Sequence, residues 1–206
     1  MLRVDNLQAG QLPPITFEVA NGECLVIEGP SGAGKTRLLR ALADLDPAPG
    51  QIFLEGAERR EMKATAWRRL FRYQSAEPAW WTDTARGSLG AAATGITRID
   101  RLLTSLGLDQ AMLDRPLATL STGERLRLAL VRSLADEPQV IALDEPTAAL
   151  DAGSAALVEE LIRYQKLAGR IVILVSHDEA LRNRLADARL MLPAPRSVPQ
   201  TAGAGA

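Results

Sequence analysis

The chain has 206 residues, a length at which one domain buries a sufficient core without disulfides or metals. Its 24 Lys and Arg residues against 25 Asp and Glu residues give a net charge of −1, which excludes the strongly basic surface of a dedicated nucleic-acid binder. Cys24 is the single cysteine, so an internal disulfide is excluded and a reducing compartment is favoured. No apolar run approaches the roughly 20 residues that cross a membrane, and residues 1–5 show no signal-peptide pattern.

The N-terminal part is predicted to form strands and a helix. Segments 16–19 and 23–27 are apolar strands on either side of Asn21-Gly22, a dipeptide that favours a tight hairpin because both residues tolerate positive φ. The leucine spacing in 37–42 predicts a helix that ends before Pro47. A short strand is expected at 51–54, whereas 67–73 fits a helix and a strand equally well.

The middle of the chain, from about 84 to 135, is predicted to be a small helical subdomain. Apolar residues at spacings of three and four share one helix face: Ile96, Ile99, Leu102, Leu103 and Leu106. Gly107 is placed to end this helix.

The C-terminal half alternates helices with apolar strands. The expected elements are helices at 123–135 and 152–168 and strands at 140–143 and 171–175. This alternation predicts an α/β fold with a parallel sheet covered on both faces. Residues 193–206 hold three prolines and no apolar period, which predicts a disordered tail.

A glycine-rich loop lies between a predicted strand and a predicted helix. It reads Gly29-Pro30-Ser31-Gly32-Ala33-Gly34-Lys35-Thr36 and fits the pattern G-x-x-x-x-G-K-[ST]. Such a loop turns backbone N–H groups around phosphate oxygens, Lys35 reaches the β- and γ-phosphates, and the Thr36 hydroxyl ligates Mg²⁺. The alternative is a turn that needs glycine only for its conformation. The Lys-Thr pair and the flanking elements favour nucleotide binding.

The strand at 140–143 is followed by two carboxylates, Asp144 and Glu145. Strand ends are where doubly wound sheets present ligand-binding groups. Asp144 is placed to organise Mg²⁺ and Glu145 to polarise an attacking water, although two solvated acids at a strand end are a common alternative. Together with the loop, they predict hydrolysis of a nucleoside triphosphate.

The segment Leu120-Ser121-Thr122-Gly123-Glu124 narrows the class. With the motifs above, it resembles the L-S-G-G-Q signature of ATP-binding cassette (ABC) ATPases of the compact bacterial type. Residues 148–151, ending in Asp151, resemble the D-loop of that family, and Ser176-His177-Asp178 resembles its switch-histidine segment. The resemblance covers about residues 3–192. It implies a P-loop NTPase core with a mainly parallel sheet, an N-terminal antiparallel β subdomain and a small α-helical signature subdomain, together one domain over 1–192.

The resemblance also implies the activity and its residues. We expect an ATPase that uses ATP and Mg²⁺, with Lys35, Glu145 and His177 acting in catalysis and Thr36 and Asp144 at the metal. The signature residues Ser121, Thr122, Gly123 and Glu124 would meet the γ-phosphate held by a second cassette, in a homodimer or heterodimer. Ser121 and Glu124 also fit a capping box, which is compatible with this role.

The family resemblance implies a place and a partner as well. A membrane-spanning transporter subunit would bind this chain at the inner, cytoplasmic face of the cell membrane, and no nucleic acid is expected. The adjacent pair Trp80-Trp81 lies where the family receives a helix of that subunit, whereas Trp67 is expected in the core. The transported substrate and its direction depend on the partner.

Three departures from the family pattern stand out. The Q-loop glutamine position is occupied by Ala76, and Gln74 lies two residues too early; a shifted loop that uses Gln74 and a substitution by Glu77 remain alternatives. Residues 6–14 contain no aromatic residue to stack on adenine, although Leu12 could substitute in part. In the signature, Thr122 and Glu124 replace glycine and glutamine.

Two other functions stay open at this stage. One is a soluble ABC ATPase that acts on targets other than transport, although the expected double cassette or long insertions are not visible. The other is a regulatory nucleotide-binding module with weak turnover, which the departures from the family pattern motivate. We also expect Ser176 and Glu179 to cap the helix after His177.

Overall fold

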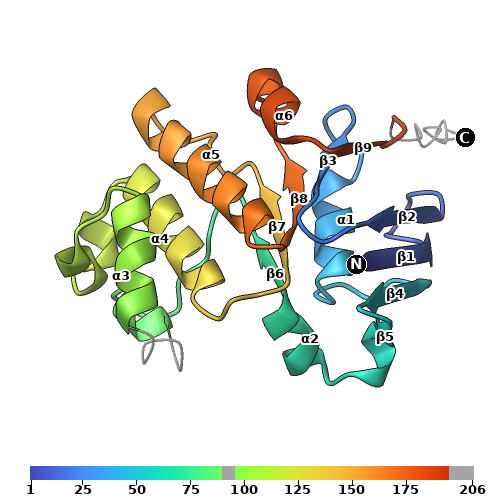
Figure 1. Cartoon of the computed structure of the whole chain (residues 1–206), viewed down its shortest axis with the longest axis horizontal. Coiled ribbons are helices and arrows are strands. Elements are labelled where there is room, and N and C mark those ends of the chain that lie inside the picture. The colour runs from blue at the N-terminus through green and yellow to red at the C-terminus, as the bar shows by residue number, and fades with distance from the viewer. Residues whose placement is uncertain (90–95, 195–206) are drawn as a thin grey trace, which may run out of the picture.

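Five parallel strands form the central sheet of the computed structural model, which describes residues 1–89 and 96–194 (Figure 1). Their order across the sheet is β6-β7-β8-β3-β9. Their bounds are β3 Cys24–Glu28, β6 Phe71–Gln74, β7 Val140–Asp144, β8 Ile171–Val175 and β9 Ala188–Met191. Neighbours in this sheet come from distant parts of the sequence, so helical crossovers must connect them.

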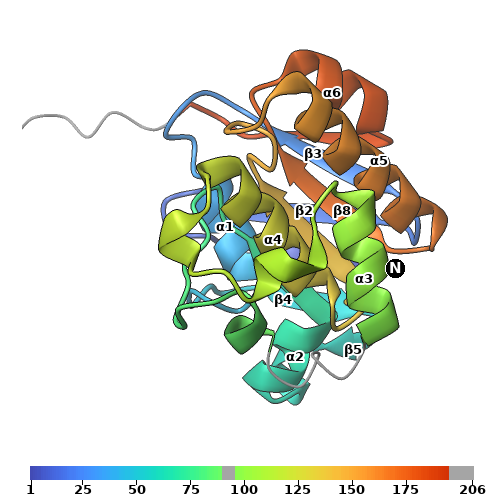
Figure 2. The same ribbon diagram turned by 90° about the vertical axis from the view of Figure 1, so that its left-hand side faces the viewer.

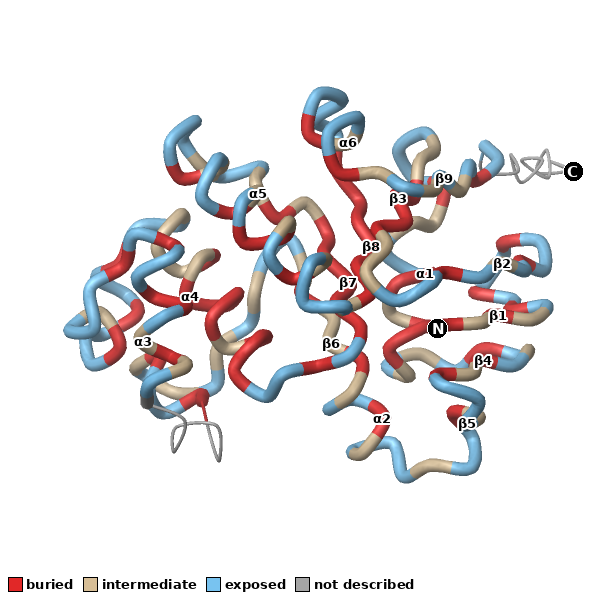
Figure 3. The backbone as a smooth tube through the Cα atoms, viewed as in Figure 1, coloured by how far each residue is buried: buried red, intermediate tan, exposed pale blue. Residues whose placement is uncertain are grey.

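Both faces of the three central strands, β7, β8 and β3, are buried, as their apolar runs predict. Alternate residues of β8 belong to different cores: Val172 and Leu174 pack on one side, and Ile171 and Ile173 on the other. Figure 3 shows the central strands as a continuous buried band between exposed loops. The two cores hold the sheet from both sides and fix the ends of its strands.

A second sheet of four strands is antiparallel, in the order β2-β1-β4-β5. Its bounds are β1 Leu2–Leu7, β2 Ile15–Val19, β4 Gln51–Leu54 and β5 Ala57–Glu58. The expected Asn21-Gly22 hairpin is therefore wrong, because β2 pairs with β1 while β3 pairs with β8 and β9. The four buried residues of β3 need cover on both faces, which the parallel sheet gives and a hairpin would not.

The helices are distributed over the two faces of the parallel sheet (Figures 1 and 2). Their bounds are α1 Lys35–Leu42, α2 Ala64–Leu70, α3 Ile96–Ser105, α4 Thr122–Leu134, α5 Ala152–Leu167 and α6 Glu179–Leu185, with short 3₁₀ segments at Arg59–Glu61, Arg86–Ser88, Gln110–Leu113 and Leu117–Thr119. Helices α3 to α6 share one core, whereas α1, α2 and the antiparallel sheet share the other. Helices α3 and α4 lie together at the left of Figure 1.

Several local predictions have clear outcomes. The ambiguous stretch 67–73 divides, because α2 ends at Leu70 and β6 begins at Phe71. Trp67 is fully buried, as expected, and its Nε1 donates to the carbonyl of Leu42 at 2.9 Å. Gly107 follows α3 with φ +63°, a value that favours glycine.

Within the described ranges, every helix is too short or too polar to pass through a bilayer. The tail predicted for 193–206 falls outside the described residues from 195 onward.

Candidate active site

The phosphate loop (residues 29–36) joins the end of β3 to the start of α1. Three of its glycines, Gly29, Gly32 and Gly34, have φ of +150°, +76° and +94°, so the loop needs residues without a Cβ. Lys35 Nζ lies inside the curve, where it donates to the carbonyls of Gly29 at 2.8 Å and Pro30 at 3.1 Å. The loop therefore presents backbone N–H groups and one ammonium group around a common centre.

An open cleft of about 770 Å³ surrounds this loop. Ser31 to Arg37 form its floor, and Asp144, Glu145, Ala76 and His177 line its other sides. The volume lies within the range of about 300–1,000 Å³ usual for small-molecule sites. The structure thus brings the predicted loop, the two carboxylates and the histidine together.

Asp144 ends β7 and is buried beside the start of α1. Its Oδ2 accepts the Thr36 hydroxyl at 2.6 Å and the Tyr73 hydroxyl at 3.2 Å. Burial raises the pKa of Tyr73 above its usual range, and the charge of Asp144 acts in the same direction, so the phenol stays protonated and donates. Sequence reasoning missed Tyr73 because β6 and β7 become neighbours only in the sheet.

The donors at Thr36 and Asp144 fit Mg²⁺. A hydroxyl and a carboxylate oxygen are hard oxygen ligands, and Mg²⁺ typically takes one or two carboxylates together with waters and substrate phosphates. Within residues 1–89 and 96–194 there is no group of three or more His, Cys, Asp or Glu that could hold a metal.

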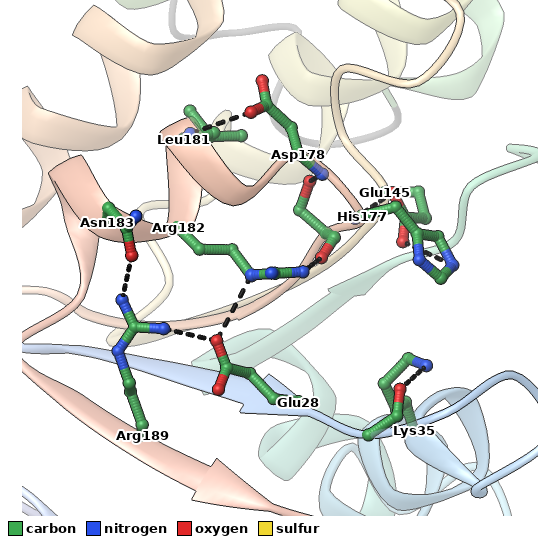
Figure 4. A network of polar contacts seen from close by, with 11 residues as sticks. Glu28, Lys35, Glu145, His177, Asp178, Leu181, Arg182, Asn183 and Arg189 are labelled. Atoms are coloured by element: carbon green, nitrogen blue, oxygen red, sulfur yellow. Dashed lines mark hydrogen bonds and ion pairs between the residues drawn. The ribbon is translucent and has the colours of Figure 1, made fainter.

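Glu145 follows Asp144 with φ +51°, a left-handed value that is uncommon for a residue with a side chain. Its Oε2 accepts the backbone N–H of His177 at 3.1 Å, and its Oε1 lies 3.6 Å from His177 Nε2 (Figure 4). Oε1 is buried and has no hydrogen-bond partner in the described part of the chain. An unpaired carboxylate oxygen is thus held beside the phosphate loop, with an exposed imidazole next to it.

His177 lies in the turn between β8 and α6, and polar contacts fix this turn. Asp178 is the N-cap of α6, because its Oδ1 accepts the N–H of Leu181 at 3.0 Å. The predicted cap by Ser176 and Glu179 is therefore wrong; the Ser176 hydroxyl instead accepts the N–H of Asp178 at 3.1 Å. The cap forms where the chain first turns into the helix, two residues later than the sequence pattern indicates.

Arg182 and Arg189 anchor α6 to the sheet behind this turn (Figure 4). Arg182 donates to the carbonyl of Ser176 at 2.8 Å and pairs with Glu28, the last residue of β3, at 3.3 Å. Arg189 of β9 also pairs with Glu28. The histidine turn and the phosphate loop therefore share a common support at the end of β3.

The signature residues lie at the start of α4 and do not line the cleft of their own chain. The capping box is confirmed: Ser121 Oγ accepts the N–H of Glu124 at 3.2 Å, and Glu124 accepts the N–H of Ser121 at 2.7 Å. These bonds lower the pKa of Glu124. The backbone N–H groups of Thr122 and Gly123, in the first turn of α4, have no hydrogen-bond partner among the described residues.

The D-loop packs against the signature, a contact that the sequence did not indicate. A Cβ at Gly123 would lie 3.1 Å from Leu150 Cδ2 and 3.5 Å from the carbonyl oxygen of Ala149. Asp151 caps α5 by accepting the N–H and hydroxyl of Ser154 at 2.9 and 2.8 Å. We call Ser121–Glu124 and Ala149–Asp151 together the signature face.

The Q-loop region shows why Gln74 does not reach the cleft. Gln74 is buried, accepts the Ser133 hydroxyl at 3.1 Å and donates to the carbonyl of Leu126 at 3.4 Å, so it bonds to α4. Ala76 lines the cleft instead. The Gln74 side chain therefore links β6 to α4 through these two hydrogen bonds.

Trp80 and Trp81 enclose an arginine of α4. The guanidinium of Arg132 lies 4.4 Å from the ring centre of Trp80 and 4.6 Å from that of Trp81, and it donates to the carbonyl of Ala79 at 2.9 Å. Burial lowers the pKa of Arg132 to about 10. Trp81 nevertheless remains 68% exposed, so part of an apolar ring faces outward beside the Q-loop.

Similarity to known proteins shows the family of this chain. The sequence profile of the ABC transporter family matches residues 12–148. The chain belongs to the ABC transporter family. Protein STAR1 of Oryza sativa subsp. japonica is 36% identical over 188 residues, which cover 87% of this chain and 54% of STAR1. The chain thus spans about half of that relative.

Other ABC proteins are similar over more of their length. The aliphatic sulfonates import ATP-binding protein SsuB 1 of Pseudomonas fluorescens is 36% identical over 197 residues, 92% of this chain and 71% of SsuB 1. The solved cassette MJ0796, in a dimeric post-hydrolysis state bound to ADP and Pi, has a TM-score of 0.81 at 22% identity and covers 93% and 94% of the two chains. The fold is that of an ABC ATPase domain, with its α/β core, antiparallel sheet and helical part in the family arrangement.

Gln74→Ala tests the structural assignment of Gln74. Since the buried Ser133 hydroxyl would lose its acceptor, we expect the free energy of unfolding in urea to fall by about 1–3 kcal/mol. ATP affinity of the folded protein should change less than about twofold, a difference below about 0.5 kcal/mol.

The matched variant is Ala76→Gln, which adds an amide to the cleft wall. It should leave the free energy of unfolding within about 0.5 kcal/mol and tighten Mg²⁺-dependent ATP binding by about two- to tenfold, the equivalent of one hydrogen bond. Loss of ATP affinity in Gln74→Ala at unchanged stability would show instead that Gln74 serves the nucleotide.

Proposed function

We propose that this chain hydrolyses ATP in a dimer of cassettes and so powers transport by a separate membrane-spanning subunit. The observation that carries the proposal is the unpaired Oε1 of Glu145, held beside His177 at the cleft that the phosphate loop floors. Hydrolysis needs an acceptor for a water proton next to a bound γ-phosphate, and this oxygen is free to be that acceptor.

In this proposal the phosphate loop holds the triphosphate and Lys35 moves from its two carbonyl acceptors to the β- and γ-phosphates. Thr36 and Asp144 would hold Mg²⁺, which when bound neutralises charge on the phosphate oxygens, and Tyr73 orients the Asp144 carboxylate. Glu145 Oε1 accepts a hydrogen bond from the attacking water, and His177 donates to the γ-phosphate as charge develops there.

The active form in this proposal is a head-to-tail dimer. Two features of the chain support it: the signature face lies outside the cleft of its own chain, and the N–H groups of Thr122 and Gly123 point from the N-terminus of a 13-residue helix. Free N–H groups at a helix N-terminus bind anions. The γ-phosphate held by one cassette is the anion that the Ser121–Gly123 turn of the other would receive, and the related cassette MJ0796 is dimeric.

The membrane partner and the location belong to the same proposal. The similar protein SsuB 1 is an import ATP-binding protein, and we place this chain at the inner face of the cell membrane beside a membrane-spanning subunit. The largely exposed Trp81 beside the Q-loop is the surface we assign to that contact. We also propose that residues 1–192 work as one ABC domain, with a helical subdomain at about 84–135.

A regulatory module with weak turnover is the second candidate, and Ala76 favours it because the cleft lacks an amide there. The two candidates differ in the rate of ATP hydrolysis by the assembled complex. Turnover that Glu145→Gln abolishes supports the ATPase, whereas ATP binding without turnover supports the module.

Glu145→Gln removes the proton acceptor while it keeps the shape of the side chain. We expect ATP affinity to change little and hydrolysis to fall by about 10²–10⁴-fold, the usual contribution of a general base. Phosphate release measures the rate. The control is Glu160→Gln, an exposed carboxylate of α5 that should keep wild-type turnover; near-wild-type turnover in Glu145→Gln would contradict the assigned role.

Trp81→Ala tests the partner surface. Because this ring is 68% exposed, its loss should leave folding intact but weaken co-purification with the membrane subunit in detergent by about tenfold, as for an interface anchor worth about 1.4 kcal/mol. Leu167→Ala removes another exposed apolar side chain, 88% exposed on α5, and should have no effect. Equal recovery of both variants would remove Trp81 from the interface.

A further inference from the structure

A second cavity, of about 190 Å³, adjoins the phosphate cleft. The two share Gln11, Arg37 and the phosphate-loop residues Gly32 to Gly34. The walls that belong to the smaller cavity alone are apolar: Ala9, Leu12, Pro13, Pro193 and Ala194. A ligand with a charged end in the larger cleft and a flat apolar end could therefore extend directly into the smaller one.

Leu12 forms the wall nearest to the loop but offers little surface. It is buried and packs on the phosphate loop, where a Cβ at Gly34 would lie 3.3 Å from its Cδ1. Among the described residues, no aromatic side chain lines this cavity. A flat polarizable surface for such a ligand would therefore have to come from a non-aromatic side chain.

Arg37 supplies such a group. It is exposed in the first turn of α1, and its side chain lies across the turn at Gly10: a Cβ there would be 2.4 Å from Arg37 Cδ and 2.5 Å from a terminal guanidinium nitrogen. A side chain at this position would displace the arginine from the turn, and the φ of +66° favours glycine as well. The bare backbone of Gly10 therefore leaves room for the guanidinium beside the two cavities that Arg37 lines.

The guanidinium of Arg37 is also free to bind. Arg40, one turn later on α1, donates twice to Asp46 at 2.8 Å. Arg37, by contrast, has no hydrogen-bond or ion-pair partner in the described ranges. The charge of Arg37 acts on the nearby carboxylate of Asp46, but both oxygens of that carboxylate accept from Arg40. A planar cation beside apolar walls and without a direct acidic contact is suited to the face of an aromatic ring.

We propose that this cavity receives the nucleoside of the bound triphosphate and that Arg37 is the platform on which the base stacks. The inference rests on the proposed function, since a triphosphate in the phosphate loop places the attached nucleoside in the adjoining space. Leu12 and Pro13 contact the base edge and ribose, and the guanidinium covers one face of the base. Arg37 is thus a nucleoside-binding residue and does not touch the reacting γ-phosphate.

The competing assignment is an Arg37 that binds phosphate through its charge alone. The test measures the affinity of the full chain for Mg-ATP and for Mg-tripolyphosphate by calorimetry, in wild type, Arg37→Ala and Arg37→Lys. Lysine keeps the charge but not the planar group. The control is Arg69→Ala, an exposed arginine of α2 that lines neither cavity.

Stacking predicts that Arg37→Ala weakens ATP binding by about tenfold, that Arg37→Lys recovers only part of this loss, and that tripolyphosphate binding stays within about twofold in every variant. Equal losses for ATP and tripolyphosphate, or full recovery by lysine, would overturn the platform and assign Arg37 to phosphate. Unchanged ATP affinity in Arg37→Ala would overturn the inference alone. Failure of the wild-type chain to bind ATP or tripolyphosphate would overturn the proposed function and the inference together.

Discussion

The hydrogen bond between the Thr36 hydroxyl and the Asp144 carboxylate, 2.6 Å long, joins the start of α1 to the end of β7. The remaining parts of the cleft depend on this junction, because it sets the phosphate loop against the carboxyl ends of the parallel strands. The loop follows β3, the two carboxylates end β7, and His177 follows β8. Since β7, β8 and β3 are neighbours in the sheet, residues more than 100 positions apart meet at one edge.

Two features of Glu145 at this edge of the sheet destabilise the folded chain. Glu145 adopts a left-handed backbone conformation and keeps a buried oxygen without a partner, and each feature costs of order 1–3 kcal/mol. The surrounding structure offsets this cost: buried strands hold the sheet from both faces, and the pair of Arg182 and Glu28 fixes the histidine turn. In the proposed dimer, the unpaired Oε1 of Glu145 at the cleft of one cassette would lie near the free N–H groups of Thr122 and Gly123 on the signature face of the other.

Much of this arrangement could be predicted from the sequence where the signal is local. The phosphate loop, the apolar strands and the capping box of Ser121 each depend on residues a few positions apart, and each pattern has few alternative structures. The five apolar positions around Ile99 and the following Gly107 predicted α3 and its end for the same reason. The family resemblance rests on these local patterns.

The features that the sequence predicted wrongly or did not predict share one physical cause. Each of them depends on contacts between segments that are distant in the sequence. Asn21-Gly22 favours a hairpin, but the doubly buried β3 pairs with β8 and β9, and burial outweighs the turn preference. The interaction of Tyr73 with Asp144 and the packing of Gly123 against Leu150 join segments that no sequence spacing relates. The bonds of Gln74 to the Ser133 hydroxyl and the Leu126 carbonyl likewise join segments more than 50 residues apart.

The central claim, a composite site completed by a second cassette, is tested most directly by the solution mass of Glu145→Gln, measured by light scattering with and without ATP. Slow hydrolysis in this variant lets ATP persist between the cassettes, and the account predicts that ATP doubles the mass. A mass that stays unchanged, with ATP binding confirmed on the same sample, would contradict a homodimer formed by this chain alone and would require the second signature face to come from a different subunit.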